Sequence, residues 1–265
     1  GVAQKPAVEL KLEYGASDLP KVPKYLGSAD YARLANEASG STLYSERAIQ
    51  LMENPTEWYH PYLYPNTNWF DEVFKKWSNT FTAAINISGG SERARYYIAA
   101  SYLDNTGNMR NLKGNQWDSN PQQKRYNFRS NIDVNVTPTT ILNVEIGANL
   151  TDLYQPGEGN RVDENDKQYW TPAERIFTYA NLANPMFPAY FPTTDPNTGA
   201  SKWHWGSPPT IGVHNPAERL FNSGYAKQYR VYAMTQIVLT QKLDFFLKGL
   251  SAKGTFAFDY YNNAM

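Results

Sequence analysis

The chain has 265 residues and no cysteine, and 25 basic side chains balance 25 acidic ones. This composition excludes a disulfide framework and a thiolate metal site, and a neutral chain lacks the basic excess of a nucleic-acid-binding domain. Twenty Tyr, twelve Phe and seven Trp accompany a hydrophobic fraction of only 41%, which favours many half-buried strands over one large dry core.

The first predicted element is a strand from Val8 to Tyr14, in which apolar and polar side chains alternate. This period of two residues is typical of a strand with one apolar face. Two helices are expected in the connection that follows. Ser28 is the expected cap of a helix through Ala38, and Ser45 is the expected cap of a helix ending near Glu53.

Four strands with the same alternation follow, from Phe81 to Ile87, Arg95 to Leu103, Tyr126 to Val136 and Leu142 to Leu150. Between the last two lies Thr137-Pro138-Thr139-Thr140, whose proline favours a tight turn, so these strands are expected to be antiparallel neighbours. Their alternate positions form a polar row, for which a lumen-facing wall is the prediction: Asn127, Arg129, Asn131, Asp133, Asn143, Glu145 and Asn149.

The last third of the chain holds one predicted helix and two predicted strands. Thr171-Pro172, with Glu174 at the third helical position, predicts a helix that begins with a capping box. The strands run from Tyr229 to Leu239 and from Leu250 to Tyr260. The total is therefore about seven strands, each with one apolar face.

The connections between these strands alternate between short and long. Short links lie at 89–92, 137–140 and 241–248, and long ones at 15–80, 104–124 and 151–226. Structureless loops beyond about 15 residues are rare in compact soluble domains, whereas outer-membrane barrels combine short periplasmic turns with long outer loops. The predicted fold is therefore all-β: a portion of a large transmembrane β-barrel, about seven antiparallel strands, with long extracellular loops containing short helices.

If the short links lie on the periplasmic side, the direction of every strand is fixed. Aromatic side chains of the apolar face are then expected to form a girdle near the loop ends of the strands. An apolar run long enough for a membrane helix, about 18 residues, does not occur in the sequence. The girdle residues are Tyr14, Phe81, Tyr102, Tyr126, Phe128, Tyr154, Tyr225, Tyr229, Phe256, Phe258 and Tyr260.

Residues with catalytic or metal-binding chemistry occur in the loops. An acidic stretch could supply a calcium site or a pair of glycosidase carboxylates, but it lacks the order of an EF-hand loop, and a solvated loop is the expectation. The histidines have no zinc spacing and are expected to be ordinary loop residues. We therefore expect no catalytic residue, metal or cofactor. The acidic residues are Glu158, Asp163, Glu164 and Asp166, and the histidines are His60, His204 and His214.

The longest predicted loop contains Tyr169-Trp170 and Trp203-His204-Trp205. Exposed aromatic rings stack on sugar faces or peptide side chains at little entropic cost, so Tyr169, Trp170, Trp203 and Trp205 are candidate substrate-binding residues. The alternative is that these rings pack inside their own loop or against a partner protein. The polar row also has two interpretations. It could line a transport path, or it could form hydrogen bonds with an internal plug.

Several blocks of the sequence resemble the SusC/RagA family of TonB-dependent outer-membrane transporters. They are Asp30-Tyr31, Asn36-Glu37-Ala38, Tyr64-Pro65-Asn66-Thr67-Asn68-Trp69, Ser88-Gly89-Gly90-Ser91-Glu92-Arg93-Ala94-Arg95-Tyr96, Arg125-Tyr126-Asn127-Phe128-Arg129-Ser130-Asn131 and Lys248-Gly249-Leu250-Ser251. The blocks lie in order through nearly the whole chain. The Tyr-Pro-Asn-x-x-Trp and Gly-Gly-Ser-Glu blocks are the most specific.

The resemblance implies that residues 1–265 form the N-terminal part of a plugged barrel of about 22 strands, without the plug and the remaining strands. It also implies import of oligosaccharides or peptides, a SusD-like lipoprotein as a lid, coupling to TonB through an N-terminal part absent from this chain, and outer-membrane lipid around the barrel. The first residue is Gly and no targeting segment follows, so an excised piece is expected.

Two other classes of protein share part of this pattern. A soluble β-rich carbohydrate-binding or glycoside hydrolase domain would also be rich in aromatic residues and could use the acidic loop. An adhesin or structural barrel would share every strand feature and lack only the lid. Barrel strands need a lipid or detergent environment, whereas a soluble domain does not, so solubility separates the first alternative from the barrel.

Overall fold

A computed structural model describes residues 4–18, 22–112, 116–158, 171–194, 201–208 and 213–264. Its main feature is a seven-stranded antiparallel sheet in the order β1-β2-β3-β4-β5-β8-β9. The strands are β1 (Gln4–Asp18), β2 (Trp77–Gly90), β3 (Ala94–Thr106), β4 (Gln122–Asn135), β5 (Thr140–Pro156), β8 (Tyr225–Lys242) and β9 (Ser251–Ala264). All seven predicted strands are confirmed, and the two strands joined by Thr137–Thr140 are antiparallel neighbours, as predicted.

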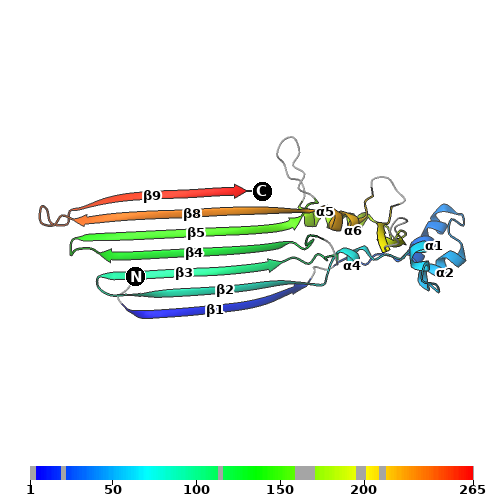
Figure 1. The fold of residues 1–265 in the computed structure, drawn as a ribbon, viewed down its shortest axis with the longest axis horizontal. Helices are drawn as coiled ribbons and strands as arrows, with labels where there is room; N and C mark the ends of the chain where they lie inside the picture. The colour runs from blue at the N-terminus through cyan, green and yellow to red at the C-terminus, as the bar shows by residue number, and fades with distance from the viewer. Residues whose placement is uncertain are drawn as a thin grey trace, which may run out of the picture.

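The remaining elements lie beyond one end of this sheet, and the tight turns lie at the other end (Figure 1). They are α1 (Ser28–Ser39), α2 (Glu46–Glu53), α3 (His60–Leu63), α4 (Trp69–Val73), α5 (Pro172–Leu182), α6 (Pro216–Asn222) and the two-stranded sheet of β6 (Tyr190–Thr194) and β7 (Ser201–Trp205). We call these two ends the loop end and the turn end. The predicted alternation of short and long connections is confirmed.

Strand pairing sorts the side chains of the sheet onto two faces. One row runs through all seven strands as Leu10, Ile85, Ala100, Phe128, Ala148, Ala233 and Tyr260. The adjacent row on the other face is Glu9, Asn86, Ala99, Arg129, Gly147, Met234 and Asp259. The sheet therefore has an apolar face and a polar face, as the period of two residues predicted.

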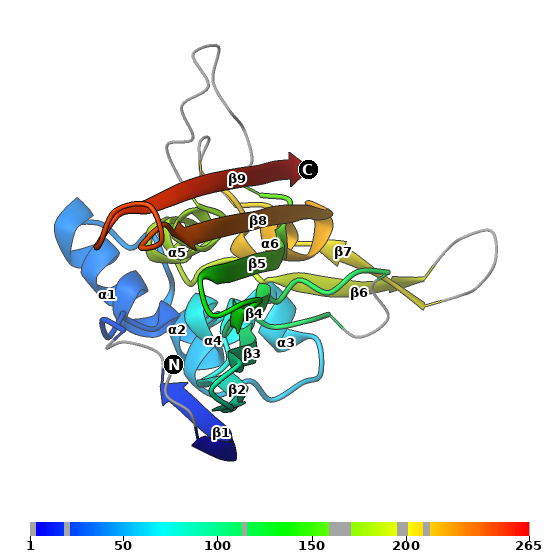
Figure 2. The ribbon, with the colours of Figure 1, turned by 90° about the vertical axis from the view of Figure 1, so that its left-hand side faces the viewer.

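Neither face of the sheet is covered by the described part of the chain. Large side chains of the apolar face are exposed, among them Leu10 at 65% and Phe256 at 62%. Both clusters of buried hydrophobic residues consist of residues outside the seven strands. Viewed from the turn end, the strands follow one another from β1 to β9, and the helices lie behind them (Figure 2). Exposed apolar surface of this extent requires an apolar environment outside the chain.

The aromatic girdle is confirmed for most of its predicted members. Tyr14 and Phe81 face each other near the loop end, and rings on neighbouring strands are in contact, with centroids 6.3 Å apart for Phe81 and Tyr102 and 5.0 Å apart for Tyr102 and Tyr126. Phe128, Phe258 and Tyr260 lie near the middle of their strands rather than at the loop end. The expectation is also wrong for Phe256, which pairs with Ile237 in the half of β9 nearer the β8–β9 turn. Its strand continues to Ala264, so the aromatic run lies lower than predicted.

Helix starts follow the predicted caps with one exception. Ser45 caps α2 by accepting a hydrogen bond from Ala48 N, and Thr171 and Glu174 form the predicted capping box of α5. The cap of α1 is Gly27 rather than Ser28. Ser28 Oγ instead donates to Pro185 O at 2.9 Å, because this serine is buried against another loop. In the described ranges, the helices are all too short or too polar to cross a bilayer.

Candidate functional site

The seven polar residues predicted as a wall lie together on the polar face of β4 and β5. Asn127 pairs with Asn149, Asn131 with Glu145, and Asp133 with Asn143. Their amides are hydrogen-bonded across the strands: Asn149 Nδ2 donates to Asn127 Oδ1, and Asn143 Nδ2 donates to Asp133 Oδ1 at 2.7 Å. The predicted juxtaposition is confirmed. That this face lines a lumen stays a prediction.

The network of the polar wall extends to the next strand. Asn127 Nδ2 donates to Ser101 Oγ on β3 at 3.0 Å, and Thr151 Oγ1 donates to Asn149 Oδ1 at 3.3 Å. Each primary amide carries two donor hydrogens and one acceptor oxygen, so these contacts leave hydrogen-bonding capacity on an exposed surface. The wall can therefore bind a polar chain, either a ligand or another protein segment.

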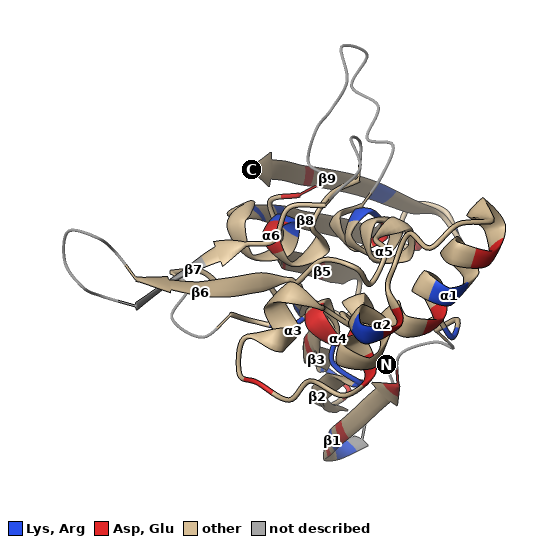
Figure 3. Ribbon diagram, turned by 90° about the vertical axis from the view of Figure 1, so that its right-hand side faces the viewer, with Lys and Arg blue, Asp and Glu red and all other residues tan. Residues whose placement is uncertain are grey.

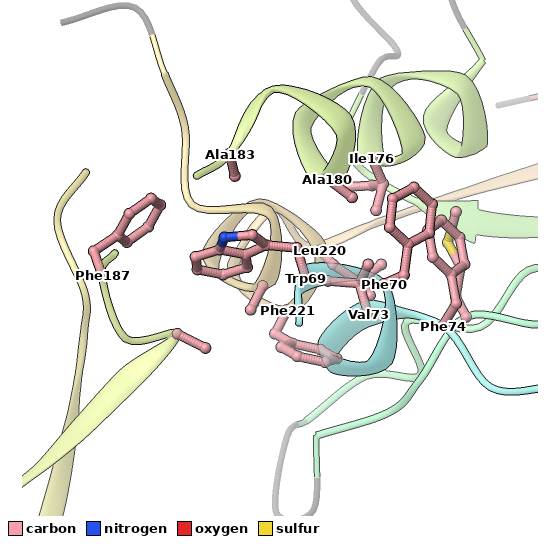
Figure 4. Packing of buried hydrophobic residues seen from close by; sticks show 13 residues of the cluster. Trp69, Phe70, Val73, Phe74, Ile176, Ala180, Ala183, Phe187, Leu220 and Phe221 are labelled. Carbon is pink, nitrogen blue, oxygen red and sulfur yellow. The ribbon is translucent and has the colours of Figure 1, made fainter. Parts of the chain in front are cut away.

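A hydrophobic cluster at the loop end joins α4, α5 and α6, although these helices are distant in the sequence (Figure 4). Trp69 of α4 is 3% exposed, and its ring centroid lies 4.5 Å from that of Phe187. Ile176 of α5 and Leu220 of α6 are fully buried. The cluster also includes Phe70, Val73, Phe74, Met109, Ala180, Ala183, Ala189, Ala217 and Phe221. This packing fixes the loops that surround the sheet end.

The Tyr-Pro-Asn-x-x-Trp block forms the junction of this cluster with α1. Asn66 Oδ1 accepts from Ser28 N at 2.9 Å, Thr67 Oγ1 donates to Phe187 O at 2.7 Å, and Trp69 Nε1 donates to Asn184 O at 2.7 Å. Asn68 caps α4 through hydrogen bonds from Phe70 N and Asp71 N. The block thus positions loops and carries no catalytic group.

Asn215 ties the β6–β7 hairpin to α6, and the sequence interpretation missed it. It is 1% exposed, and its Nδ2 donates to Ala189 O at 2.7 Å and to Gly206 O at 2.9 Å. Its Oδ1 accepts from Ala217 N and Glu218 N, which caps α6. All the donors and acceptors of its amide group therefore serve the loop structure. The Asn215-Pro216 pair was the available signal, because Asn at the cap and Pro at the first helical position favour a helix start.

The predicted substrate-binding aromatics are only partly visible. Tyr169 and Trp170 lie outside the described residues. The backbone of Trp203 pairs with Pro192 in the β6–β7 hairpin, and its side chain also lies outside the described part. The ring of Trp205 is partly buried against the hydrophobic cluster and stacks on Phe221 with centroids 6.1 Å apart. A binding role for these residues stays a prediction.

Glu158 is the one member of the acidic stretch within the described residues; Asp163, Glu164 and Asp166 lie outside. Its carboxylate is 3.6 Å from Arg175 Nε of α5 and 3.9 Å from Arg219 Nη1 of α6, and it accepts from Tyr179 Oη at 3.1 Å. Burial raises the pKa of the Tyr179 hydroxyl, and the Glu158 carboxylate raises it further. Basic and acidic residues are interspersed over the helices at the loop end (Figure 3). This cluster attaches α5 and α6 to the end of β5.

The histidines are placed apart and make different contacts. His60 Nδ1 accepts from Thr56 N at 3.1 Å and from Glu57 N at 3.0 Å, which closes the turn before α3. His214 Nδ1 contacts Arg219 Nη2 at 2.9 Å, and the His204 ring stacks on Phe191. Among the described residues, no group of three or more His, Cys, Asp or Glu side chains could hold a metal ion.

A cavity of about 780 Å³ opens beside α4, between the end of β1 and the segment before α1. Basic and aromatic side chains line it, among them Lys75, Lys76, Arg110 and Tyr25. Arg110 Nε donates to Phe74 O at 3.0 Å, and the Tyr25 ring stacks on Phe70 at 5.5 Å.

Comparison with known proteins identifies relatives among outer-membrane receptors. No family model matches the sequence. The chain is similar to TonB-dependent receptor P26 of Formosa agariphila, with 26% identity over 51% of this chain and 12% of that receptor. It is also similar to TonB-dependent receptor P3 of the same organism, with 26% identity over 52% of this chain and 11% of that receptor. The matched region therefore spans about a tenth of these relatives.

The fold is similar to part of solved transporter structures. The RagAB peptide importer in the closed-closed state matches with a TM-score of 0.57 and 16% identity, over 99% of this chain and 29% of that one. The open-open state matches with a TM-score of 0.59 and 14% identity, over 28% of that chain. The relatives are receptors and importers, in agreement with the expectation of a chain without catalytic activity. In sequence this chain is thus similar to TonB-dependent receptors, which are outer-membrane proteins, and its fold is that of a portion of a RagA-like barrel.

Proposed function

We propose that this chain is the N-terminal part of a plugged barrel that imports oligosaccharides or peptides through the outer membrane, with energy supplied through TonB. The observation that carries the proposal is the two-faced sheet. Its apolar face carries exposed large side chains on β1, β2, β4, β5, β8 and β9, and its other face carries the hydrogen-bonded polar wall. An outward apolar band and a polar interior are what a transport barrel needs in lipid.

A lid protein is supported by the surface of the helical unit formed by α1, α2 and α3, of which α1 and α2 lie far from the sheet (Figure 1). Its own core is small, with Ala32 and Ile49 buried. Large apolar side chains remain exposed on it: Tyr31, Leu34, Leu43, Trp58, Tyr59 and Leu63. Such surfaces commonly mark protein interaction sites. We propose a SusD-like lipoprotein as the partner, in line with the two-component name of the RagAB importer.

The proposed substrate contact is the aromatic group Tyr169, Trp170, Trp203 and Trp205 together with the mouth of the barrel. Trp205 anchors the β7 strand to the hydrophobic cluster, and Trp203 is two residues away on the same strand. Aromatic rings bind both sugar faces and peptide side chains, so this group supports either substrate class. The name of the RagAB peptide importer favours peptides as the first class to test.

Orientation in the membrane is tested by cysteine labelling of the full receptor. Ser41→Cys lies in the helical unit and Ser91→Cys in the β2–β3 turn, and both positions are exposed. We expect an impermeant maleimide to label Ser41→Cys on intact cells and Ser91→Cys only after the outer membrane is opened. Residues 1–265 contain no cysteine, and the receptor without either substitution is the control for labelling elsewhere. Labelling in the reverse order would invert the barrel.

Import is tested with receptor-deleted cells that carry the wild-type receptor, Trp203→Ala or Trp205→Ala. Loss of one stacking ring is expected to weaken the apparent affinity for the imported peptide or oligosaccharide about fivefold in Trp203→Ala. Trp205→Ala is the comparison, because loss of its packing is expected to loosen the loop unit. Import that does not depend on the receptor would refute the proposal. Unchanged uptake in Trp203→Ala would remove this residue from the site.

A further inference from the structure

On β3, β4, β5 and β8, the apolar face carries charged side chains at one level, near the loop end. Asp104 on β3 pairs with Lys124 on β4, and Lys124 pairs with Asp152 on β5. Lys227 on β8 extends the series, with Nζ 3.7 Å from Asp152 Oδ2. We call these four residues the charged row. On these four strands, the residues of the same face between the charged row and the turn end are uncharged.

Neighbouring polar and aromatic side chains contact Asp104 and Lys227 of the charged row. Tyr102 Oη donates to Asp104 Oδ2 at 3.1 Å, and Gln122 Nε2 donates to Asp104 Oδ1 at 2.9 Å. Lys227 Nζ lies 4.7 Å from the centroid of the Tyr229 ring. The Lys227 side chain is 41% exposed and that of Asp152 is 23% exposed. The row is thus partly accessible and adjacent to the aromatic girdle.

The position of the charged row keeps it on the outside of a complete barrel. Its four residues lie on β3, β4, β5 and β8, whereas the edges of the sheet are β1 and β9. Further barrel strands would pair at those edges, and a plug would contact the opposite, polar face. In the proposed receptor, only the membrane is left to cover the row. A charged side chain inside the hydrocarbon is costly, so the row belongs at the level of lipid headgroups.

We propose that the charged row is a binding site for the phosphorylated headgroups of outer-leaflet lipid. The inference rests on the proposed membrane orientation, in which the loop end faces outward. The ammonium groups of Lys124 and Lys227 donate charge-assisted hydrogen bonds to phosphate oxygens. Asp104 and Asp152 alternate with the lysines and balance their charge, so the row has no net charge to attract a soluble polyanion. A lipid phosphate is already adjacent to the row, because the membrane holds it there.

The test measures lipid that copurifies with the full receptor extracted from its outer membrane in mild detergent. The variant is Lys124→Gln with Lys227→Gln, and bound phosphorylated lipid is counted by native mass spectrometry. We expect about tenfold less bound outer-leaflet lipid than in the wild type, since two cations near a membrane surface are lost. The matched control is Arg125→Gln with Arg230→Gln, two cations at similar depth on the polar face; it should retain the lipid.

Equal lipid retention in the lysine variant and the wild type would overturn the proposal, and so would equal loss in the control. Replacement of both lysines by arginine should restore binding, which separates a headgroup site from a folding defect. If the double variant does not assemble, Lys227→Gln alone is compared with Lys227→Arg in the same way. Peptide and oligosaccharide uptake are measured in parallel. If lipid binding depends on the lysines but neither peptide nor oligosaccharide is imported, only the proposed import function is refuted. If the receptor imports its substrate but binds no lipid, only the lipid site is refuted.

Discussion

Arginine at Ile85 is expected to destabilise the barrel by about 2–4 kcal/mol, whereas arginine at the next residue, Asn86, is expected to be tolerated. Ile85 lies near the middle of β2 on the apolar face, between Leu10 and Ala100. A guanidinium there would enter the hydrocarbon. Asn86 lies on the polar face and already donates to Glu9 Oε2 at 3.1 Å, so an arginine would form an ion pair with the same carboxylate.

The measurement is urea unfolding of the full receptor in lipid vesicles, with both variants compared with the wild type. The two positions are adjacent, so strand propensity and distance from the membrane surface are matched, and only the face differs. Equal destabilisation at both positions would show that the two faces of the sheet are in the same kind of environment. That result would contradict a lipid-exposed barrel and favour a soluble sheet, which is the alternative left open by the sequence.

The strands were predictable because their pattern depends on a simple physical requirement. A sheet with different solvents on its two faces must alternate polar and apolar residues along each strand. Asn127, Asn131 and Asn149 could therefore be placed on one face from the sequence, and strand pairing confirms it. The same reasoning located both ends of the β4–β5 turn, where Thr137 and Thr140 hydrogen-bond each other through their backbones.

The loop end was less predictable because its structure comes from contacts between distant segments. The β6–β7 hairpin contains Pro192, which argues against a strand, and it is held by Asn215 from a later loop. Helix α4 has only five residues, too few to show a repeating hydrophobic pattern at helical spacing. Glu158 was placed in a solvated acidic loop, but its partners Arg175 and Arg219 come from helices far along the chain. No local pattern encodes such pairings.

Alanine at Leu220 is expected to destabilise the loop unit by about 2–5 kcal/mol, the usual range for a buried leucine truncated to alanine. Leu220 is fully buried where α6 meets α4 and α5. The sheet takes no part in this cluster, so the barrel should still assemble while α4, α5 and α6 lose protection from hydrogen exchange. The readouts are amide hydrogen exchange in these helices and, for the barrel, the difference in electrophoretic mobility between unheated and heated samples.

The matched control is Leu182→Ala, the same chemical change at the end of α5, where the side chain is 64% exposed. Exposed substitutions usually change stability by less than about 0.5 kcal/mol, so exchange in the control should equal that of the wild type. If Leu220→Ala also abolishes barrel assembly, the loop cluster and the sheet form one cooperative unit. If instead only the loops open, loss of import in this variant would show that an ordered loop unit is needed at the barrel mouth, independently of the strands in the membrane.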